Sequence, residues 1–271
     1  MPRARRFNWD NLVLRVVSGV ILAPAVLAVA WLGGGLFLVM VSVAVSVLSI
    51  EWAMMVARPA PARLAVTMTA AVLAVVFLTY VQQTYSAFAM IALGAIAAAI
   101  VSRGVTERRA DAAYGVLYVA PACLALIWLR HTAQGAGWTV MLFATTWAAD
   151  ICAFAVGNAL KGPRLWPRYS PNKTWSGFFG GLIGAAAAGA GVAALLMHLS
   201  LVGAGLIGLS AGLATMMGDL WESMLKRRFG VKDSGDLIPG HGGLLDRVDG
   251  LMFATMVFAG ARLIVRYGWA H

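Results

Sequence analysis

The sequence predicts an all-α protein, a polytopic membrane bundle of about nine transmembrane helices with a cytoplasmic N-terminus and an external C-terminus. The chain of 271 residues is 61% hydrophobic and only 12% charged, about half the charged fraction of a soluble domain. Apolar runs long enough to cross a bilayer follow one another along most of the chain. The net charge of +10 lies mainly between these runs, which favours a role in membrane topology over nucleic-acid binding.

The expected spans divide into five N-terminal helices within residues 1–140 and four in a C-terminal catalytic region, residues 141–271. The first run is longer than the apolar segment of a usual signal peptide, so we expect it to be retained despite an Ala-Val-Ala sequence at 28–30. Small residues recur every four positions in the seventh and eighth spans, which lets helices approach closely in lipid and leaves a homodimer open. The expected spans are 12–31, 36–56, 64–81, 86–101, 114–130, 137–157, 177–197, 201–222 and 248–267.

Basic residues are distributed unevenly between the two sides of this arrangement. With nine spans, all but three of the 21 Lys and Arg residues fall on the side of the N-terminus, the exceptions being Arg130, Arg262 and Arg266. The positive-inside rule makes that side cytoplasmic. Two polar connections, 158–176 and 223–247, are therefore expected to face the cytoplasm.

Acidic residues inside membrane spans are costly and usually functional. At 1.5 Å per helical residue, six of them fall in the cytoplasmic third of the membrane or at its edge. Three polar residues at the cytoplasmic end of the eighth span stand at i, i+3 and i+4, on one helical face. The six carboxylates are Glu51, Asp150, Asp219, Glu222, Asp246 and Asp249, and the helical face combines Asp219, Glu222 and Ser223.

Basic residues are interleaved with these carboxylates, a combination that suits an oxyanion-rich substrate bridged to the protein by hard divalent ions. Magnesium with phosphate is the commonest such pair, and a second cation stays open. Backbone N–H groups of Gly242 and Gly243 can approach a phosphate closely. The candidate phosphate-binding side chains are Lys173, Lys226, Arg227, Lys232 and Arg247, with Ser170, Ser223 and His241 as further donors.

Simpler interpretations stay open for single residues, such as an interfacial ion pair for Glu51 or a turn cap for His241. A transporter of an anionic metabolite would explain the intramembrane charges. It would not explain why they all lie on one side, because alternating access needs a site near the midplane. A second alternative is another CTP-using lipid enzyme, such as a polyprenol kinase or an archaeol cytidylyltransferase.

The stretch from 223 to 249 resembles the signature of the phosphatidate cytidylyltransferase (CDP-diacylglycerol synthase) family. A second region, from Asp150 to Gly181, is also similar to the family, with Ser176 and Phe154 as departures where glutamate and tyrosine are usual. The resemblance is clear from about 145 to 250. The matching signature residues are Ser223, Leu225, Lys226, Arg227, Lys232, Asp233, Gly235, Ile238, Pro239, His241, Gly242, Gly243, Leu244, Asp246, Arg247, Val248 and Asp249.

The resemblance implies a Mg²⁺-dependent nucleotidyltransferase that converts CTP and phosphatidic acid into CDP-diacylglycerol and pyrophosphate at a bacterial cytoplasmic (inner) membrane. Its site would face the cytoplasm. Lys226 and Arg247 would act with three carboxylates, Asp219, Asp246 and Asp249, which are the expected metal ligands, and Asp150 or Glu222 would complete the metal shell. The other basic, serine, histidine and glycine residues named above would bind substrate.

Overall fold

A computed structural model describes residues 9–167, 169–235 and 242–267, and these form nine helices and one two-stranded hairpin. The expected spans are confirmed as helices, with ends shifted by a few residues. The helices are α1 (Trp9–Leu32), α2 (Gly34–Val56), α3 (Pro61–Tyr80), α4 (Thr84–Val101), α5 (Arg109–His131), α6 (Gly135–Leu160), α7 (Trp175–Leu196), α8 (Leu201–Arg228) and α9 (Leu245–Tyr267). The strands are β1 (Arg164–Trp166) and β2 (Ser170–Thr174).

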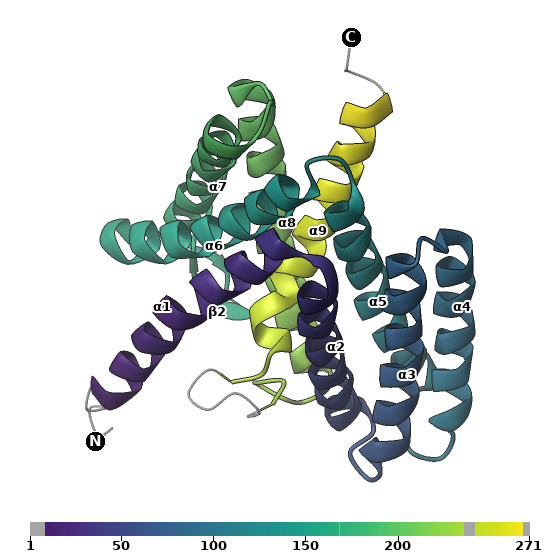
Figure 1. Cartoon of the computed structure of the whole chain (residues 1–271). Coiled ribbons are helices and arrows are strands. Elements are labelled where there is room, and N and C mark those ends of the chain that lie inside the picture. The colour runs from purple at the N-terminus through teal and green to yellow at the C-terminus, as the bar shows by residue number, and fades with distance from the viewer. Residues whose placement is uncertain (1–8, 168, 236–241, 268–271) are drawn as a thin grey trace, which may run out of the picture.

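The helices pack in two neighbouring groups, as Figure 1 shows. Helices α2 to α5 form one group, and α6 to α9 form the other. Helix α5 also packs against α6 and α9, and α1 contacts both α6 and α2. These contacts join the two groups. The division of the chain into two regions near residue 140 remains a prediction.

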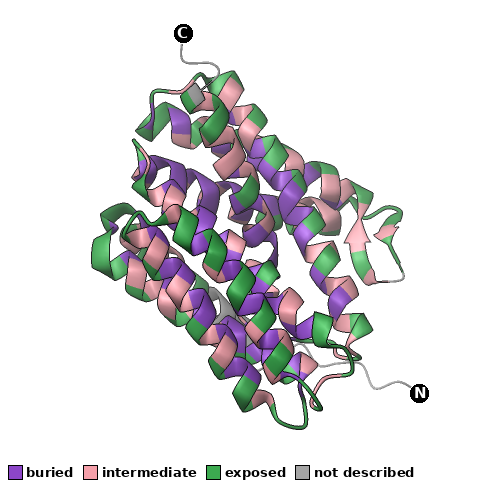
Figure 2. Cartoon of the chain, turned by 90° about the vertical axis from the view of Figure 1, so that its right-hand side faces the viewer, coloured by how far each residue is buried: buried purple, intermediate pink, exposed green. Residues whose placement is uncertain are grey.

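Eight of the described helices, α2 to α9, are long and apolar enough to cross a membrane, and the described apolar part of α1 begins at Gly19. Their outward faces carry exposed apolar side chains such as Val66 and Ile183, each 70% exposed. Figure 2 shows buried residues on the inner faces of the helices and exposed residues on the outer ones. Broad apolar outer surfaces of this kind suit lipid rather than water.

Small residues bring α6, α7 and α8 together. A side chain at Gly177 or Gly181 would collide with α6, at the carbonyl oxygens of Ala153 and Ala149 respectively. On α8, Gly208 packs against the backbone of α7 in the same way. These glycine faces are used inside one chain, so they do not favour the homodimer for which the sequence left them open.

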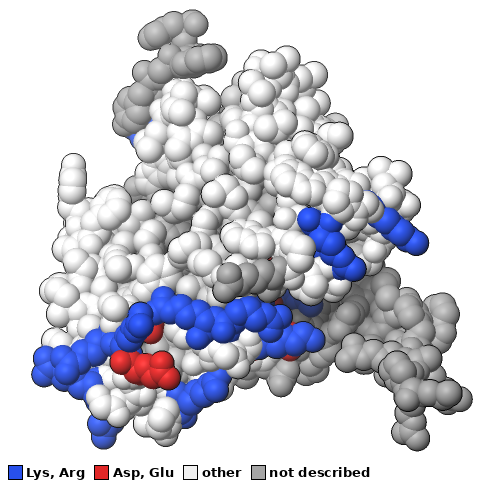
Figure 3. All heavy atoms as spheres, turned by 180° about the vertical axis from the view of Figure 1, so that it is seen from behind, with Lys and Arg blue, Asp and Glu red and all other residues white. Residues whose placement is uncertain are grey.

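Most charged side chains lie at one end of the molecule. Figure 3 shows Lys and Arg side chains gathered in a band at the end opposite to that where α9 finishes. At the far end, Arg130 donates hydrogen bonds of 2.7 Å to the carbonyl oxygens of Ala30 and Trp31, where the carbonyl-rich C-terminus of α1 favours a cation. The orientation of the bundle in a membrane remains a prediction.

Two connections differ from expectation. The loop expected at 158–176 contains the antiparallel β1–β2 hairpin, in which Arg164 is paired with Thr174 and Trp166 with Ser170. The connection expected at 223–247 begins later, because α8 continues to Arg228. Both differences place more of the candidate site on regular structure.

Candidate active site

Helix α8 presents four polar side chains along one face at its charged end. Asp219, Glu222, Ser223 and Lys226 stand at i, i+3, i+4 and i+7, which is one helical stripe. The hydroxyl of Ser223 lies 3.5 Å from Oδ1 of Asp219. The three basic residues of the last turn interact favourably with the negative C-terminal end of the helix dipole. They therefore stabilise the helix to the end of the stripe.

A close crossing of α8 and α9 brings their carboxylates together. A side chain at Gly218 would collide with the backbone of Asp249 and Gly250, and one at Gly250 would collide with Thr215. Only glycine therefore allows the two helices to meet at this level. Asp219 and Asp249 each lie next to one of these glycines, and Asp249 is within electrostatic reach of Asp219, Glu222 and Asp150.

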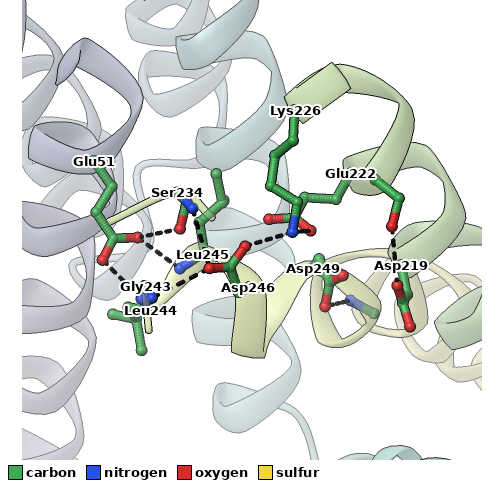
Figure 4. A network of polar contacts seen from close by, with 12 residues as sticks. Glu51, Asp219, Glu222, Lys226, Ser234, Gly243, Leu244, Leu245, Asp246 and Asp249 are labelled. Carbon is green, nitrogen blue, oxygen red and sulfur yellow. Dashed lines mark hydrogen bonds and ion pairs between the residues drawn. The ribbon is translucent and has the colours of Figure 1, made fainter. Parts of the chain in front are cut away.

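Lys226 links the two helices. Its Nζ lies 2.6 Å from Oε2 of Glu222 and 2.5 Å from Oδ1 of Asp246. Figure 4 shows this ammonium group between the two carboxylates. Glu222 is only 1% exposed, and its second oxygen, Oε1, has no hydrogen-bond partner among the described residues. Glu222 therefore keeps one buried oxygen free for another positive group.

Asp246 also organises the connection before α9. Its Oδ2 accepts hydrogen bonds from the backbone N–H groups of Ser234, at 3.1 Å, and Gly243, at 3.2 Å. Gly242 has a φ of +75°, which favours glycine, and a side chain at Gly243 would collide with Ser234. The Gly243 N–H is thus bonded to Asp246 in this structure, and its role as a phosphate donor remains a prediction.

Glu51 of α2 fixes the same connection from the other side. It is fully buried, and its carboxylate accepts hydrogen bonds from N–H groups of Leu244 and Leu245, both at 2.7 Å, and from the Ser234 hydroxyl at 3.2 Å. These are among the first N–H groups of α9, which lack partners within the helix. The bonds are drawn in Figure 4. Among the described residues, Glu51 therefore holds the start of α9 through backbone N–H groups, rather than forming the interfacial ion pair that the sequence left open.

The β1–β2 hairpin brings a second lysine to the acidic residues. Lys173 of β2 forms an ion pair with Asp219. Asp150 of α6 is within electrostatic reach of Asp219, Lys173 and Arg247. The hairpin runs into α7 through Thr174, whose hydroxyl accepts a hydrogen bond of 3.1 Å from the Gly177 N–H and caps that helix.

The remaining predicted residues lie around this cluster. Ser170 begins β2 and is half-buried. Arg227, Lys232 and Arg247 are exposed, as suits side chains that meet a soluble anion. His241 lies outside the described residues. The two departures from the family pattern differ in their surroundings: Phe154 is 75% exposed on α6, whereas Ser176 donates a hydrogen bond to the carbonyl oxygen of Lys161.

The donor set suits a hard divalent cation. Its atoms are carboxylate and hydroxyl oxygens, which Mg²⁺ prefers, and Glu222 offers a buried oxygen without a partner in the described part of the chain. Within that same part, no three His, Cys, Asp or Glu side chains are already arranged around one metal position. Lys173 and Lys226 instead neutralise Asp219, Glu222 and Asp246.

The sequence predicts Glu51 near the site but does not reveal its hydrogen-bond partners. The useful signal was a glutamate in an otherwise apolar span, which must find strong donors when it is buried. Which donors it would find depended on how the residues around Ser234 and Gly243 fold. That fold brings Ser234, Leu244 and Leu245 to Glu51, although they lie 183, 193 and 194 positions further along the chain.

This fold and site define an integral membrane enzyme whose carboxylates and cationic side chains converge at one end of a helical bundle. The sequence profile described as the cytidylyltransferase family matches residues 13–264. The chain belongs to the cytidylyltransferase family, and it is a nucleotidyltransferase. The membership predicted from the sequence is confirmed.

Two similar proteins match nearly the whole chain, and a third matches just over half of it. A Brucella suis protein named phosphatidate cytidylyltransferase is 36% identical over 252 residues, which is 91% of each chain. A protein of the same name from Rickettsia bellii is 28% identical over 261 residues, covering 92% of this chain and 89% of its own. Another from Pseudomonas aeruginosa is 39% identical over 163 residues, 57% of each chain.

Proposed function

We propose that this protein transfers the cytidylyl group of CTP to phosphatidic acid, giving CDP-diacylglycerol for phospholipid biosynthesis and pyrophosphate. The observation that carries the proposal is the interleaving of Lys173 and Lys226 with carboxylates of α8 and α9 at the charged end of the bundle. The family membership and the names of the relatives support this choice of substrates.

The reaction needs charge neutralisation and alignment more than it needs a protein nucleophile. A phosphate oxygen of phosphatidic acid forms a bond to the α-phosphorus of CTP. The bond from that phosphorus to the β-phosphate oxygen breaks, and pyrophosphate leaves with the electron pair. Because the attacking phosphate is already anionic near neutral pH, no general base is required. Two polyanions must instead be brought together against their repulsion.

Cationic side chains would perform that task. Lys173 and Lys226 lie at the acidic cluster, while the exposed Arg227, Lys232 and Arg247 can meet the phosphates of CTP. Mg²⁺ would neutralise phosphate charge when bound by Asp219, Asp246 and Asp249, with Asp150 or Glu222 as further oxygen ligands; a second cation would find its ligands in the same set.

We also propose that the charged end faces the cytoplasm of a bacterial inner membrane. The gathering of basic side chains there supports it, and CTP is a soluble nucleotide that would enter from that side. Lipid would arrive sideways from the adjacent leaflet.

Asp246→Asn tests the site directly. Loss of one carboxylate oxygen removes the charge that faces Lys226, so we expect pyrophosphate release from CTP and phosphatidic acid to stop while the purified variant still elutes as the wild type does. Glu107→Gln, an exposed carboxylate outside the site, is the matched control and should leave the rate unchanged. Turnover of Asp246→Asn at the wild-type rate would remove Asp246 from the mechanism.

A further inference from the structure

An apolar groove lies between α5 and α9, beside the acidic cluster. It has a volume of about 240 Å³ and is lined by side chains from both helices. The lining residues used below are Tyr114, Tyr118 and Ala122 of α5 and Met252, Phe253 and Met256 of α9. The reaction described above does not use any of them.

On α9 the groove begins one helical turn beyond a residue of the candidate site. On α9, Asp249, Met252, Phe253 and Met256 stand at i, i+3, i+4 and i+7, so they share one face of the helix. The apolar lining therefore starts at Met252, on the same helix face as Asp249 and three residues after it. Each turn of the helix carries the groove about 5.4 Å further from the charged end.

The groove opens on the outer surface of the spanning helices. Met256 is 50% exposed and Leu117, which also lines the groove, is 48% exposed, whereas Ala122 is 6% exposed. The exposed pair forms the mouth and Ala122 lies in the floor. Since α5 and α9 are both membrane spans by length and composition, the mouth faces lipid.

The polar end of the groove carries an unsatisfied donor. Tyr118 is 8% exposed, and its hydroxyl has no hydrogen-bond partner among the residues that the structure describes. Tyr118 is also within electrostatic reach of Asp249 and Glu222. A buried hydroxyl without a partner is unfavourable, so an occupant with an acceptor oxygen at this level would relieve that cost.

We propose that this α5–α9 groove holds an acyl chain of the lipid substrate, with the Tyr118 hydroxyl donating a hydrogen bond to an ester carbonyl oxygen. The inference rests on the proposed function. With the lipid phosphate near Asp249, the glycerol esters lie about one helical turn deeper, at the level of Tyr118 and Met252. The acyl chain then continues past Phe253 to the mouth at Met256.

The groove positions the lipid rather than attracting it. Bilayer lipid is as apolar as the lining side chains, so moving a chain from the membrane into the groove brings little hydrophobic gain. Holding the chain and the ester fixes the direction in which the phosphate approaches CTP, and alignment of reactants lowers the barrier. We therefore expect discrimination between lipids by chain length and by the ester group.

Two lipids that differ only at the ester test the hydrogen bond. Tyr118→Phe should raise the KM for dioleoyl phosphatidic acid about 3- to 10-fold, the range of one lost hydrogen bond, and leave the KM for the dioleyl ether analogue unchanged. The ether lacks the carbonyl oxygen, so a merely structural role of Tyr118 would affect both lipids equally. An equal effect on both lipids, or no effect on either, overturns the hydrogen bond.

Chain length tests the groove itself. Met256→Trp, at the exposed mouth, should lower kcat/KM for dioleoyl phosphatidic acid at least fivefold relative to dibutanoyl phosphatidic acid, whose four-carbon chains end before the mouth, about 6 Å beyond the level of the esters. Ile264→Trp, exposed on α9 outside the groove, is the matched control and should leave the ratio unchanged. An unchanged ratio of the two kcat/KM values in Met256→Trp overturns the proposal. If the oligomeric mass of that variant also shifts, the groove is covered by a second copy of the chain instead.

The two proposals fail differently. If the wild-type protein forms no cytidylylated lipid from any phosphatidic acid, the proposed function is wrong. If the wild type is active and the variants leave its lipid preference unchanged, only the groove assignment is wrong.

Discussion

Replacing Glu51 with glutamine should destabilise the start of α9 and slow the reaction. The buried carboxylate accepts three hydrogen bonds, from the N–H groups of Leu244 and Leu245 and from the Ser234 hydroxyl. Glutamine keeps one acceptor oxygen and turns an NH₂ group toward the remaining donors, so at least one buried N–H loses its partner. The expected cost is about 2 kcal/mol, or about 4–8 °C in the unfolding midpoint for a chain of this size.

The effect on catalysis follows from the neighbouring bonds. Gly243, whose N–H donates to Asp246, directly precedes the residues that Glu51 holds. A displacement of that segment by even about 1 Å can cost up to about 100-fold in rate, and we expect kcat to fall about 10- to 100-fold. Purified variants would be compared by thermal unfolding in detergent and by pyrophosphate release.

Ser49→Ala is the matched control on the same helix. Ser49 is fully buried, and its hydroxyl has no partner in the described part of the chain, so its removal should leave stability unchanged or raise it. If Glu51→Gln and Ser49→Ala both unfold at the wild-type midpoint and turn over at the wild-type rate, Glu51 does not position α9.

Further substitutions test other parts of the site. Gly218→Val should push α8 and α9 apart at the level of Asp249, abolishing activity and lowering the unfolding midpoint, and wild-type activity would show that the close crossing is dispensable. Lys173→Ala should raise the KM for CTP about tenfold, with Lys173→Arg restoring most of the affinity, because a cation is needed there; equal KM values in all three proteins would contradict this. Arg228→Ala removes a half-exposed ion pair with Asp111 and should cost less than about 1 kcal/mol, so a larger drop in unfolding free energy would refute the surface assignment. EDTA should stop pyrophosphate release and added Mg²⁺ should restore it, whereas a rate insensitive to EDTA would exclude the metal shell.

Much of the fold could be predicted because lipid imposes a simple rule. Every backbone polar group in the bilayer core must be satisfied internally, so long apolar runs had to be helices. The regular spacing of Asp219, Glu222 and Ser223 placed them on one face as soon as that segment was helical. Asp246 and Asp249 followed likewise, since α9 has begun by Leu245.

The rest depended on contacts that a local pattern does not contain. The β1–β2 hairpin that carries Lys173 lies in a connection with no alternating apolar pattern, so sequence periodicity gave no strand signal. The expected eighth span ended at residue 222, whereas α8 continues through Lys226 and Arg227 to Arg228. The helix continues because Lys226 is neutralised by Glu222 one turn earlier and by Asp246 of α9.

The glycine pattern illustrates the same limit. Its spacing predicted close helix contacts, and Gly181 and Gly208 do make them. The spacing could not say which helix would be the partner. Gly181 of α7 packs against α6, and Gly208 of α8 packs against α7, within the same chain.

The fate of each phosphate of CTP distinguishes cytidylyl transfer to phosphatidic acid from transfer of the terminal phosphate. Purified protein would be mixed with Mg²⁺, dioleoyl phosphatidic acid and CTP labelled at either the α- or the γ-phosphate. With cytidylyl transfer, the α-label enters the lipid and the γ-label is released as pyrophosphate. Transfer of the γ-label to a lipid, with CDP as the soluble product, would contradict it and indicate a CTP-dependent kinase.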